Sequence, residues 1–206
     1  MTTDKSLFYY GALYHKLFNA KLEEARQQII NLIPEGAHVL DIGCGTGLLC
    51  SQLASQKQCR VVGIDLSLKM LRYARENNSS NAIEYLHKDA TDLAEFSDDA
   101  FDYATMLVFI HELPAQQQVK ALQEALRVAP RLIICDSAVP LPWNLHGFQV
   151  RLAEYVFGRD HLPQFKRFVS LGGIDGVLRQ SNLSYGVDYR DLFWNDTREI
   201  VLVSRR

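Results

Sequence analysis

Three glycines follow a short apolar stretch early in the chain, and their spacing suits the binding of a nucleotide-like ligand. Residues 39–47 read Val-Leu-Asp-Ile-Gly-Cys-Gly-Thr-Gly. Glycine lacks a Cβ, so a ligand can lie directly against this backbone. A helix that begins immediately afterwards would point its free N–H groups at the ligand. The pattern predicts a strand, a glycine turn and a helix that together form a cofactor site at the carboxyl end of a parallel strand.

The spacing of the glycines distinguishes between cofactors. A dinucleotide-binding fingerprint, G-x-G-x-x-G, would need a third glycine at position 48, where the chain has Leu48. Instead the pattern is D-x-G-x-G-x-G, with Asp41 two residues before the first glycine. This pattern resembles motif I of the class I S-adenosylmethionine (SAM) dependent methyltransferases. The alternative is an ordinary strand–turn–helix junction that binds nothing, but three further features lie where that family would have them.

Two acidic residues end predicted strands downstream of the glycines. Asp65 ends the stretch 60–65, where a carboxylate can accept hydrogen bonds from both hydroxyls of a ribose. Dinucleotide sites use an acid at the same place, and a helix N-cap or a surface acid is the alternative. Asp89 and Ala90 follow a third predicted strand, where the resemblance implies contacts with adenine; a surface turn is the alternative there.

The third feature is residues 101–114, where Phe-Asp begins an apolar run that ends in His-Glu-Leu-Pro. It resembles the fourth-strand motif of small-molecule methyltransferases. The resemblance implies that Leu107 and Val108 lie beside the cofactor and that His111 stands where the substrate enters. His111 could accept a proton or orient the substrate, and the alternative is a structural histidine bonded to a loop carbonyl.

The resemblance assigns roles to individual residues of the site. Asp41 would hold the amides of the turn and orient the cofactor amino group, and Leu66 and Met70 would pack on adenine. No metal is expected. The cofactor residues are Asp41, Gly43, Gly45, Thr46, Gly47, Asp65, Leu66, Met70, Asp89, Ala90, Leu107 and Val108; His111 is the catalytic candidate, and Tyr9, Tyr10, Tyr14, Trp143 and Tyr155 are candidates for acceptor binding.

Strand-like and helix-like segments alternate from about residue 37 onward, which predicts an α/β fold with a mainly parallel sheet. Strands are expected near 37–42, 60–65, 82–87, 102–108 and 131–136, and two more near 183–190 and 197–204. The last two are joined by a connection too short for a crossover helix, so they should be antiparallel. The resemblance implies a Rossmann-like three-layer sandwich with a seven-stranded sheet and an antiparallel C-terminal strand.

Two segments do not fit this alternation. Residues 6–33 carry two helical patterns, and residues 137–172 are far longer than the usual connection in an α/β unit. Both could cover the ligand edge of the sheet as helical lids, or their aromatic residues could be core. We therefore expect an N-terminal helical lid segment at 1–36 and a methyltransferase domain at 37–206 with a lid insertion at about 137–172.

Composition narrows the class of protein. The 206 residues suffice for one domain. A formal net charge of −2 argues against a nucleic-acid partner. The four cysteines form no C-x-x-C pair, which is typical of reduced thiols in a cytoplasmic protein. The sequence shows no signal peptide and no apolar run long enough to span a bilayer, and it leaves the oligomeric state open. A basic run at 151–167 is usually a solvated face but could meet an anionic substrate or a lipid surface.

These features together predict an enzyme that transfers a methyl group from SAM to a small-molecule acceptor by in-line displacement. Aligning donor and acceptor is the main task of such a site, and a base is needed only if the acceptor must lose a proton. Two alternatives stay open. One is an NAD-dependent oxidoreductase, against which Leu48 argues, and the other is a non-catalytic SAM-binding protein.

Overall fold

A computed structural model describes residues 11–157 and 162–206 of the chain, and the side chains of residues 22–155 and 162–206. Within these ranges the strands form one seven-stranded sheet in the order β3-β2-β1-β4-β5-β7-β6. The first five are parallel to one another, and β7 lies antiparallel between β5 and β6. The strands are β1 (His38–Ile42), β2 (Arg60–Asp65), β3 (Ile83–His87), β4 (Tyr103–Leu107), β5 (Arg131–Ser137), β6 (Tyr185–Phe193) and β7 (Arg198–Arg205).

This sheet confirms the predicted α/β class, the seven strands and the antiparallel C-terminal hairpin. The central strands are apolar throughout because helices cover both of their faces. In β5, Leu132 and Ile134 face one core cluster, whereas Ile133 and Cys135 face the other. Alternate residues of one strand therefore belong to two separate cores, one on each side of the sheet.

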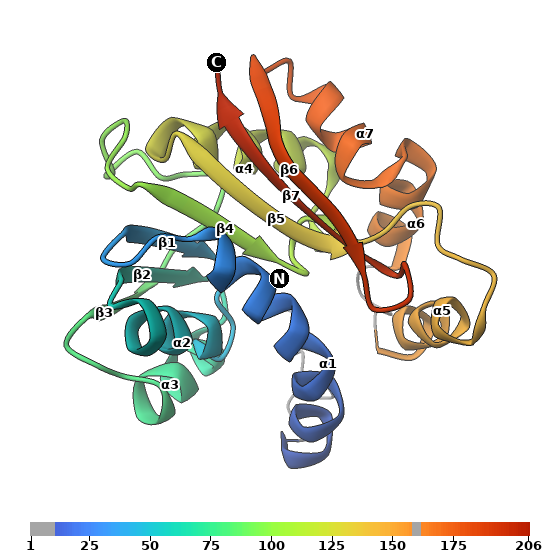
Figure 1. Cartoon of the computed structure of the whole chain (residues 1–206), viewed down its shortest axis with the longest axis horizontal. Helices are drawn as coiled ribbons and strands as arrows, with labels where there is room; N and C mark the ends of the chain where they lie inside the picture. Colours follow the sequence, from blue (N-terminus) through green and yellow to red (C-terminus); the bar gives the residue numbers. More distant parts are fainter. Residues whose placement is uncertain (1–10, 158–161) are drawn as a thin grey trace.

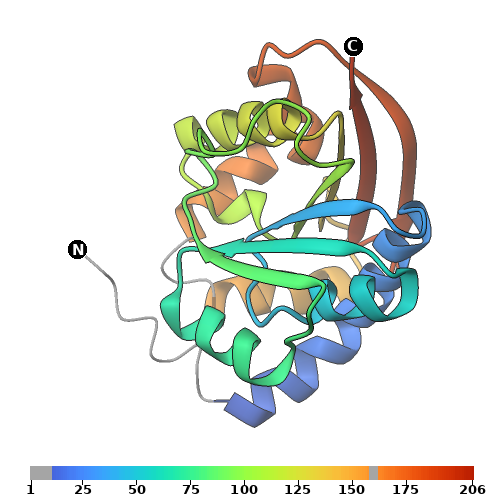
Figure 2. The same cartoon turned by 90° about the vertical axis from the view of Figure 1, so that its left-hand side faces the viewer.

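Helices on both faces complete the three-layer sandwich. Figures 1 and 2 show α1, α2 and α3 on one side of the sheet and α4 and α7 on the other. The first group packs with Val39, Val61 and Ile133, and the second with Leu40, Met106 and Leu132. Their bounds are α1 (Gly11–Leu32), α2 (Leu48–Lys57), α3 (Leu68–Asn77), α4 (Ala115–Val128) and α7 (Gly173–Gln180).

The N-terminal segment is one helix over its described part, where the sequence pattern indicated two. In the C-terminal half of α1, Ala25, Ile29 and Ile30 are fully or almost fully buried in the same cluster as Val39 of β1. This half is therefore a core layer of the sandwich. The predicted lid over residues 1–36 concerns mainly positions outside the described side chains, and it stays a prediction.

The insertion after β5 contains two helices, α5 (Leu145–Phe157) and α6 (Leu162–Leu171). The chain leaves the carboxyl end of β5 toward them, as Figure 1 shows. Phe165 and Phe168 of α6 are buried, and α6 packs against α7 and against the short 3-10 helix η2 (Ile110–Glu112) that follows β4. The insertion thus lies at the edge of the sheet where parallel strands end.

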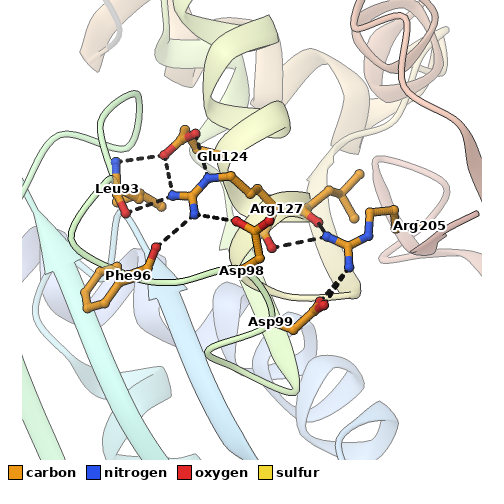
Figure 3. Close-up of polar contacts among 8 residues, drawn as sticks. Leu93, Phe96, Asp98, Asp99, Glu124, Arg127 and Arg205 are labelled. Carbon is orange, nitrogen blue, oxygen red and sulfur yellow. Dashed lines mark hydrogen bonds and ion pairs between the residues drawn. The ribbon is translucent and has the colours of Figure 1, made fainter.

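The connection between β3 and β4, residues 88–102, contains no helix and is held by two arginines from elsewhere in the chain. The Arg127 guanidinium donates to the carbonyls of Leu93 and Phe96 over 2.9 and 2.8 Å and pairs with Asp98 and Glu124. Arg205 of β7 pairs with Asp99 and donates to the end of α4. Figure 3 shows both guanidinium groups directed at this connection, which they fix near the end of the sheet opposite the glycine turn.

Among the described residues, no helix combines the length and the apolar character needed to cross a bilayer.

Candidate active site

The predicted site residues converge at one edge of the sheet. The strand order changes direction between β1 and β4, since β2 and β3 continue on one side of β1 and β5 on the other side of β4. Ligands of open α/β sheets bind at such a switch point, outside the carboxyl ends of the strands. β1 ends at Ile42 and β4 at Leu107, and their paired registers place the two ends side by side. The glycine turn and the start of η2 therefore flank the same switch point.

The glycine turn is anchored to the neighbouring strand β2. The N–H groups of Gly43 and Cys44 donate to the carbonyl of Ile64 over 2.9 and 3.0 Å. The N–H of Gly45 donates to Oδ2 of Asp65 over 2.9 Å. Gly47 follows as the N-cap of α2, which begins at Leu48. The turn is thus a preformed loop whose amide positions are set by the end of β2.

The three glycines are required for different reasons. All have positive φ, at 73°, 54° and 74° for Gly43, Gly45 and Gly47. A Cβ at Gly43 would lie 2.3 Å from the ring of Phe109, and one at Gly47 would lie 2.3 Å from the hydroxyl of Tyr85. A Cβ at Gly45 would meet nothing within 4 Å. The absent side chain at Gly43 thus accommodates Phe109, whereas Gly45 presents bare backbone to open space. The close approach of a cofactor to both glycines, which the resemblance implies, stays a prediction.

Asp41 does not hold the amides of the turn, contrary to the expectation from sequence. Its side chain points sideways from β1, where Oδ1 accepts from the hydroxyl of Thr105 over 2.7 Å and Oδ2 from the thiol of Cys50 over 3.3 Å. Burial raises the pKa of Asp41 to about 6, and these two donors only partly offset that effect. Asp41 therefore links β1, β4 and α2 beneath the site.

Asp65 lies at the end of β2, where the resemblance implies a ribose ligand, and its carboxylate accepts hydrogen bonds from two backbone amides. Its Oδ1 accepts from the N–H of Ser67 over 2.7 Å, and its Oδ2 accepts from Gly45. Each carboxylate oxygen can accept more than one hydrogen bond. Asp65 is only partly buried, so its carboxylate can still receive a hydroxyl from outside. The alternative of a simple helix cap is excluded for the side chain, because Ser67 caps α3 by accepting from Met70.

The end of β3 lies next to Asp65, as predicted. The N–H of Lys88 donates to the Asp65 carbonyl over 3.3 Å. Oδ1 of Asp89 accepts from the N–H and the hydroxyl of Thr91, both over 2.8 Å, so Asp89 stabilises a turn. Leu66 is 60% exposed beside these acids, whereas Ala90 is buried in the core. The adenine-contacting roles of Asp89, Ala90, Leu66 and Met70 remain predictions.

The chain turns sharply where β4 ends. Leu107 and Val108 are partly buried, and Val108 has a φ of 51°, which is uncommon for a β-branched residue. Its N–H donates to the carbonyl of Cys135 over 2.7 Å, which fixes the turn against β5. Such outliers are frequent at functional sites. This turn brings the ring of Phe109 onto Gly43.

His111 is buried and belongs to a row of three ionisable side chains. Its Nδ1 lies 2.7 Å from Oδ1 of Asp136 at the end of β5, and its Nε2 lies 3.8 Å from Oε1 of Glu154 on α5. Burial disfavours the charged ring, but Asp136, Glu154 and Glu112 together raise the pKa of His111 to about 9. The same pairing lowers the pKa of Asp136 despite its complete burial. Attraction between opposite charges thus outweighs desolvation in this pair.

The sequence did not single out four of these neighbours. Asp136 and Glu154 contact His111, and the rings of Phe165 and Phe168 lie 5.5 and 6.1 Å from its ring. Asp136 had one detectable signal, an acid at the carboxyl end of a predicted apolar strand. Glu154 had none, because only the fold of the insertion brings it to His111.

The structure describes the side chains of only two of the five aromatic candidates for acceptor binding, Trp143 and Tyr155. Tyr9 and Tyr10 lie outside the described residues, and Tyr14 lies outside the described side chains. Trp143 is 95% exposed and stacks with the guanidinium of Arg151, and Tyr155 is 68% exposed. Their part in binding an acceptor stays a prediction.

The donor set at the turn suits SAM. The bare backbone at Gly45, the amides before α2 and the exposed carboxylate of Asp65 could receive its methionine carboxylate and its ribose. Within residues 11–157 and 162–206, no cluster of three or more His, Cys, Asp or Glu side chains is arranged to hold a metal ion.

Comparison with known proteins agrees with this arrangement. Residues 39–130 match the model of a methyltransferase domain family. The chain is 36% identical over 180 residues to a demethylmenaquinone methyltransferase of Porphyromonas gingivalis, covering 79% of this chain and 67% of the relative. It is 32% identical over 135 residues to the O-methyltransferase cnsE of Penicillium expansum, covering 63% of this chain and 49% of the relative. The chain thus spans between half and two thirds of the length of these two relatives.

A solved structure shows the same fold. The PH0226 protein of Pyrococcus horikoshii superposes with a TM-score of 0.69 at 20% identity, over 95% of this chain and 93% of that one. The matched family segment runs from β1 to the end of α4 and so contains the glycine turn, Asp65, Asp89 and His111. On this match and on the 36% identity to a methyltransferase, the chain belongs to the class I SAM-dependent methyltransferases.

Proposed function

We propose that this protein transfers the methyl group of SAM to a small hydroxylated aromatic acceptor. The observation that carries the proposal is the contact between Gly45 and Asp65, which presents open backbone and a carboxylate together at the switch point of the sheet. The names of the relatives support the acceptor class, because one acts on a demethylated quinone and another is an O-methyltransferase.

When bound, SAM supplies a methyl group carried on a sulfonium, and the sulfur is the leaving group, as a neutral thioether. The residues of this chain have the tasks of binding and alignment. Gly45, Thr46 and the N-terminus of α2 would hold the methionine end, and Asp65 the ribose. Leu66 and Met70 would cover the adenine, with Asp89 and Ala90 at its edge. Leu107 and Val108 would separate the donor from the acceptor side, where the His111 row lies. Alignment in a water-poor site can lower the barrier by up to about 7–11 kcal/mol.

Two measurements test the proposal. Calorimetry should show binding of SAM and of its demethylated product at micromolar concentrations. Mass spectrometry should show a gain of one methyl group on a short-chain demethylmenaquinol in the presence of SAM. A folded protein that binds neither SAM nor its product at hundreds of micromolar would contradict the cofactor, and binding without transfer to this acceptor would contradict the acceptor class.

The second candidate, an NAD-dependent oxidoreductase, shares the acid at Asp65 but lacks the third glycine, since α2 begins at Leu48. A fluorescence titration with NADH distinguishes the two, and we expect no change in nicotinamide emission.

A further inference from the structure

The row Asp136–His111–Glu154 joins three elements that are distant in sequence. Asp136 is the penultimate residue of β5, His111 lies in η2 after β4, and Glu154 lies in the last turn of α5. Besides the imidazole, Asp136 accepts from the N–H of Ser137 over 2.6 Å and from the N–H of His111 over 3.4 Å. These donors hold Asp136 as the ionised inner end of the row. They also commit Nδ1 of His111 to donating toward Asp136.

Exposure increases along the row. The side chains of Asp136 and His111 are 0% and 1% exposed, whereas that of Glu154 is 12% exposed. The rings of Phe165 and Phe168 pack beside the imidazole, with centroids 5.5 and 6.1 Å from it. Nε2 of His111 faces Glu154 rather than solvent. A molecule that enters from outside therefore meets the carboxylate of Glu154 before it can meet the ring.

The row adjoins the predicted methyl-donor site. Phe109, two residues before His111, packs its ring onto Gly43 of the glycine turn. The N–H of Val108 and the His111–Asp136 pair both fasten this segment to the end of β5. The row consequently lies on the β4–β5 side of the switch point, next to the β1–β2 side that carries Gly45 and Asp65.

Given the proposed function, we infer that Glu154 is the acid–base residue that takes the proton from the methyl acceptor, and that His111 and Asp136 are positioning residues that hold its carboxylate.

The charges of the row are consistent with this division of roles. The groups that face His111 are Asp136 from β5, Glu154 from α5 and Glu112 from η2, while Arg198 of β7 faces Asp136. With a pKa raised to about 9, the ring carries a proton at neutral pH and cannot accept another. A protonated ring between two carboxylates can instead orient the carboxylate of Glu154, whose Oε1 lies 3.8 Å from Nε2 of His111.

The proton balance of the reaction is simple. The acceptor loses one proton from its hydroxyl to a carboxylate oxygen of Glu154. The electron pair released by that proton forms the bond to the methyl carbon at oxygen. Where a ring carbon attacks instead, that carbon then loses its own hydrogen as a proton and the oxygen regains one, so the ring is aromatic again and the net release is still one proton. The carbon–sulfur bond breaks with its electron pair on sulfur, so one positive charge leaves the sulfonium and one proton is released through Glu154.

The test compares single-turnover methyl transfer to a short-chain demethylmenaquinol in the wild type, Glu154→Gln, Glu154→Asp and His111→Gln. General-base catalysis contributes about 10²–10⁴-fold, so Glu154→Gln should slow transfer by at least about 10²-fold. Its Kd for SAM should stay within about twofold, because no SAM contact is removed. Glu154→Asp should recover part of the rate. His111→Gln should lower the rate constant of transfer more than it changes the half-saturating acceptor concentration, since it removes the group that orients the carboxylate of Glu154.

The matched control is Glu84→Gln, which removes an exposed carboxylate on β3. It should leave transfer and SAM binding unchanged. Transfer by Glu154→Gln at the wild-type rate would overturn the inference and leave the proposed function intact. Equal loss in Glu154→Gln and Glu154→Asp, with an unchanged rate constant of transfer in His111→Gln, would also overturn it. Absence of transfer by the wild type would instead overturn the proposed acceptor class, and this inference with it.

Discussion

The N–H of Gly45 donates a hydrogen bond to Oδ2 of Asp65 over 2.9 Å, between residues 20 positions apart in the sequence. This contact joins the only glycine of the turn that faces open space to the acid at the end of β2. It arranges both groups before any ligand arrives. Preorganisation of this kind reduces the entropy lost on binding. The contact thus sets the two groups in the geometry that a nucleoside with an adjacent carboxylate would need.

Asp65→Ala should weaken SAM binding by about 30-fold or more, because two charge-assisted hydrogen bonds to the ribose are lost. Asp65→Asn keeps the size and one acceptor oxygen, so we expect a smaller loss of about tenfold. Calorimetric titration of each variant with SAM measures the change. A Kd for Asp65→Ala equal to that of the wild type would remove Asp65 from the cofactor site.

Gly45→Ala and Gly36→Ala form a matched pair for the open face of the turn. Both glycines have positive φ, 54° and 76°, and at both a Cβ would meet no atom within 4 Å. Alanine in this conformation should lower the free energy of unfolding by about 1–2 kcal/mol at either position. Only Gly45→Ala should also weaken SAM binding, by about tenfold or more, since its methyl group occupies the ligand face. Equal Kd values in the two variants would contradict contact between the cofactor and Gly45.

The stability of the protein should depend on pH through His111. Its pKa is about 9 in the folded protein against 6.5 for an unperturbed histidine, so the folded state binds the proton more tightly than the unfolded state. This contribution is complete below pH 6.5 and is lost as the pH rises through about 9. In urea unfolding, the free energy of unfolding of His111→Gln should lie below that of the wild type at low pH. This difference should shrink by on the order of 3 kcal/mol as the pH rises through the window. A difference between the two proteins that is constant with pH would contradict a proton shared by His111 and Asp136.

Arg127→Ala should lower the free energy of unfolding by about 2 kcal/mol. The substitution removes the guanidinium that donates to the carbonyls of Leu93 and Phe96 and pairs with Glu124. Arg127 holds the connection at Leu93 and Phe96, beyond Asp89 and Ala90 (Figure 3), and it touches none of the residues proposed to hold SAM, so the Kd for SAM should change by less than about twofold. Chemical denaturation and calorimetry measure the two quantities. Arg72→Ala, on an exposed position of α3, is the control and should change stability by less than about 0.5 kcal/mol.

Local patterns determined much of this protein. The strands β1 to β5 lie within two residues of the predicted segments, because their apolar runs and the turn residues that bound them are local signals. The glycine turn could be predicted for the same reason, since positive φ at three positions requires the residue without a Cβ. The short link between β6 and β7 similarly required an antiparallel pair.

Tertiary structure decided which partners these residues have. Asp41 was expected beneath the turn amides, but the neighbouring β4 and α2 offered it the hydroxyl of Thr105 and the thiol of Cys50. Glu154 carried no signal in its own segment and reaches His111 only because the insertion folds back over the end of β5. The pKa values of His111 and Asp136 are shifted because the two side chains are buried together, although they lie 25 residues apart in the sequence. A sequence pattern encodes local conformation, whereas hydrogen-bond partners and pKa values depend on distances that exist only after the strands and helices have packed.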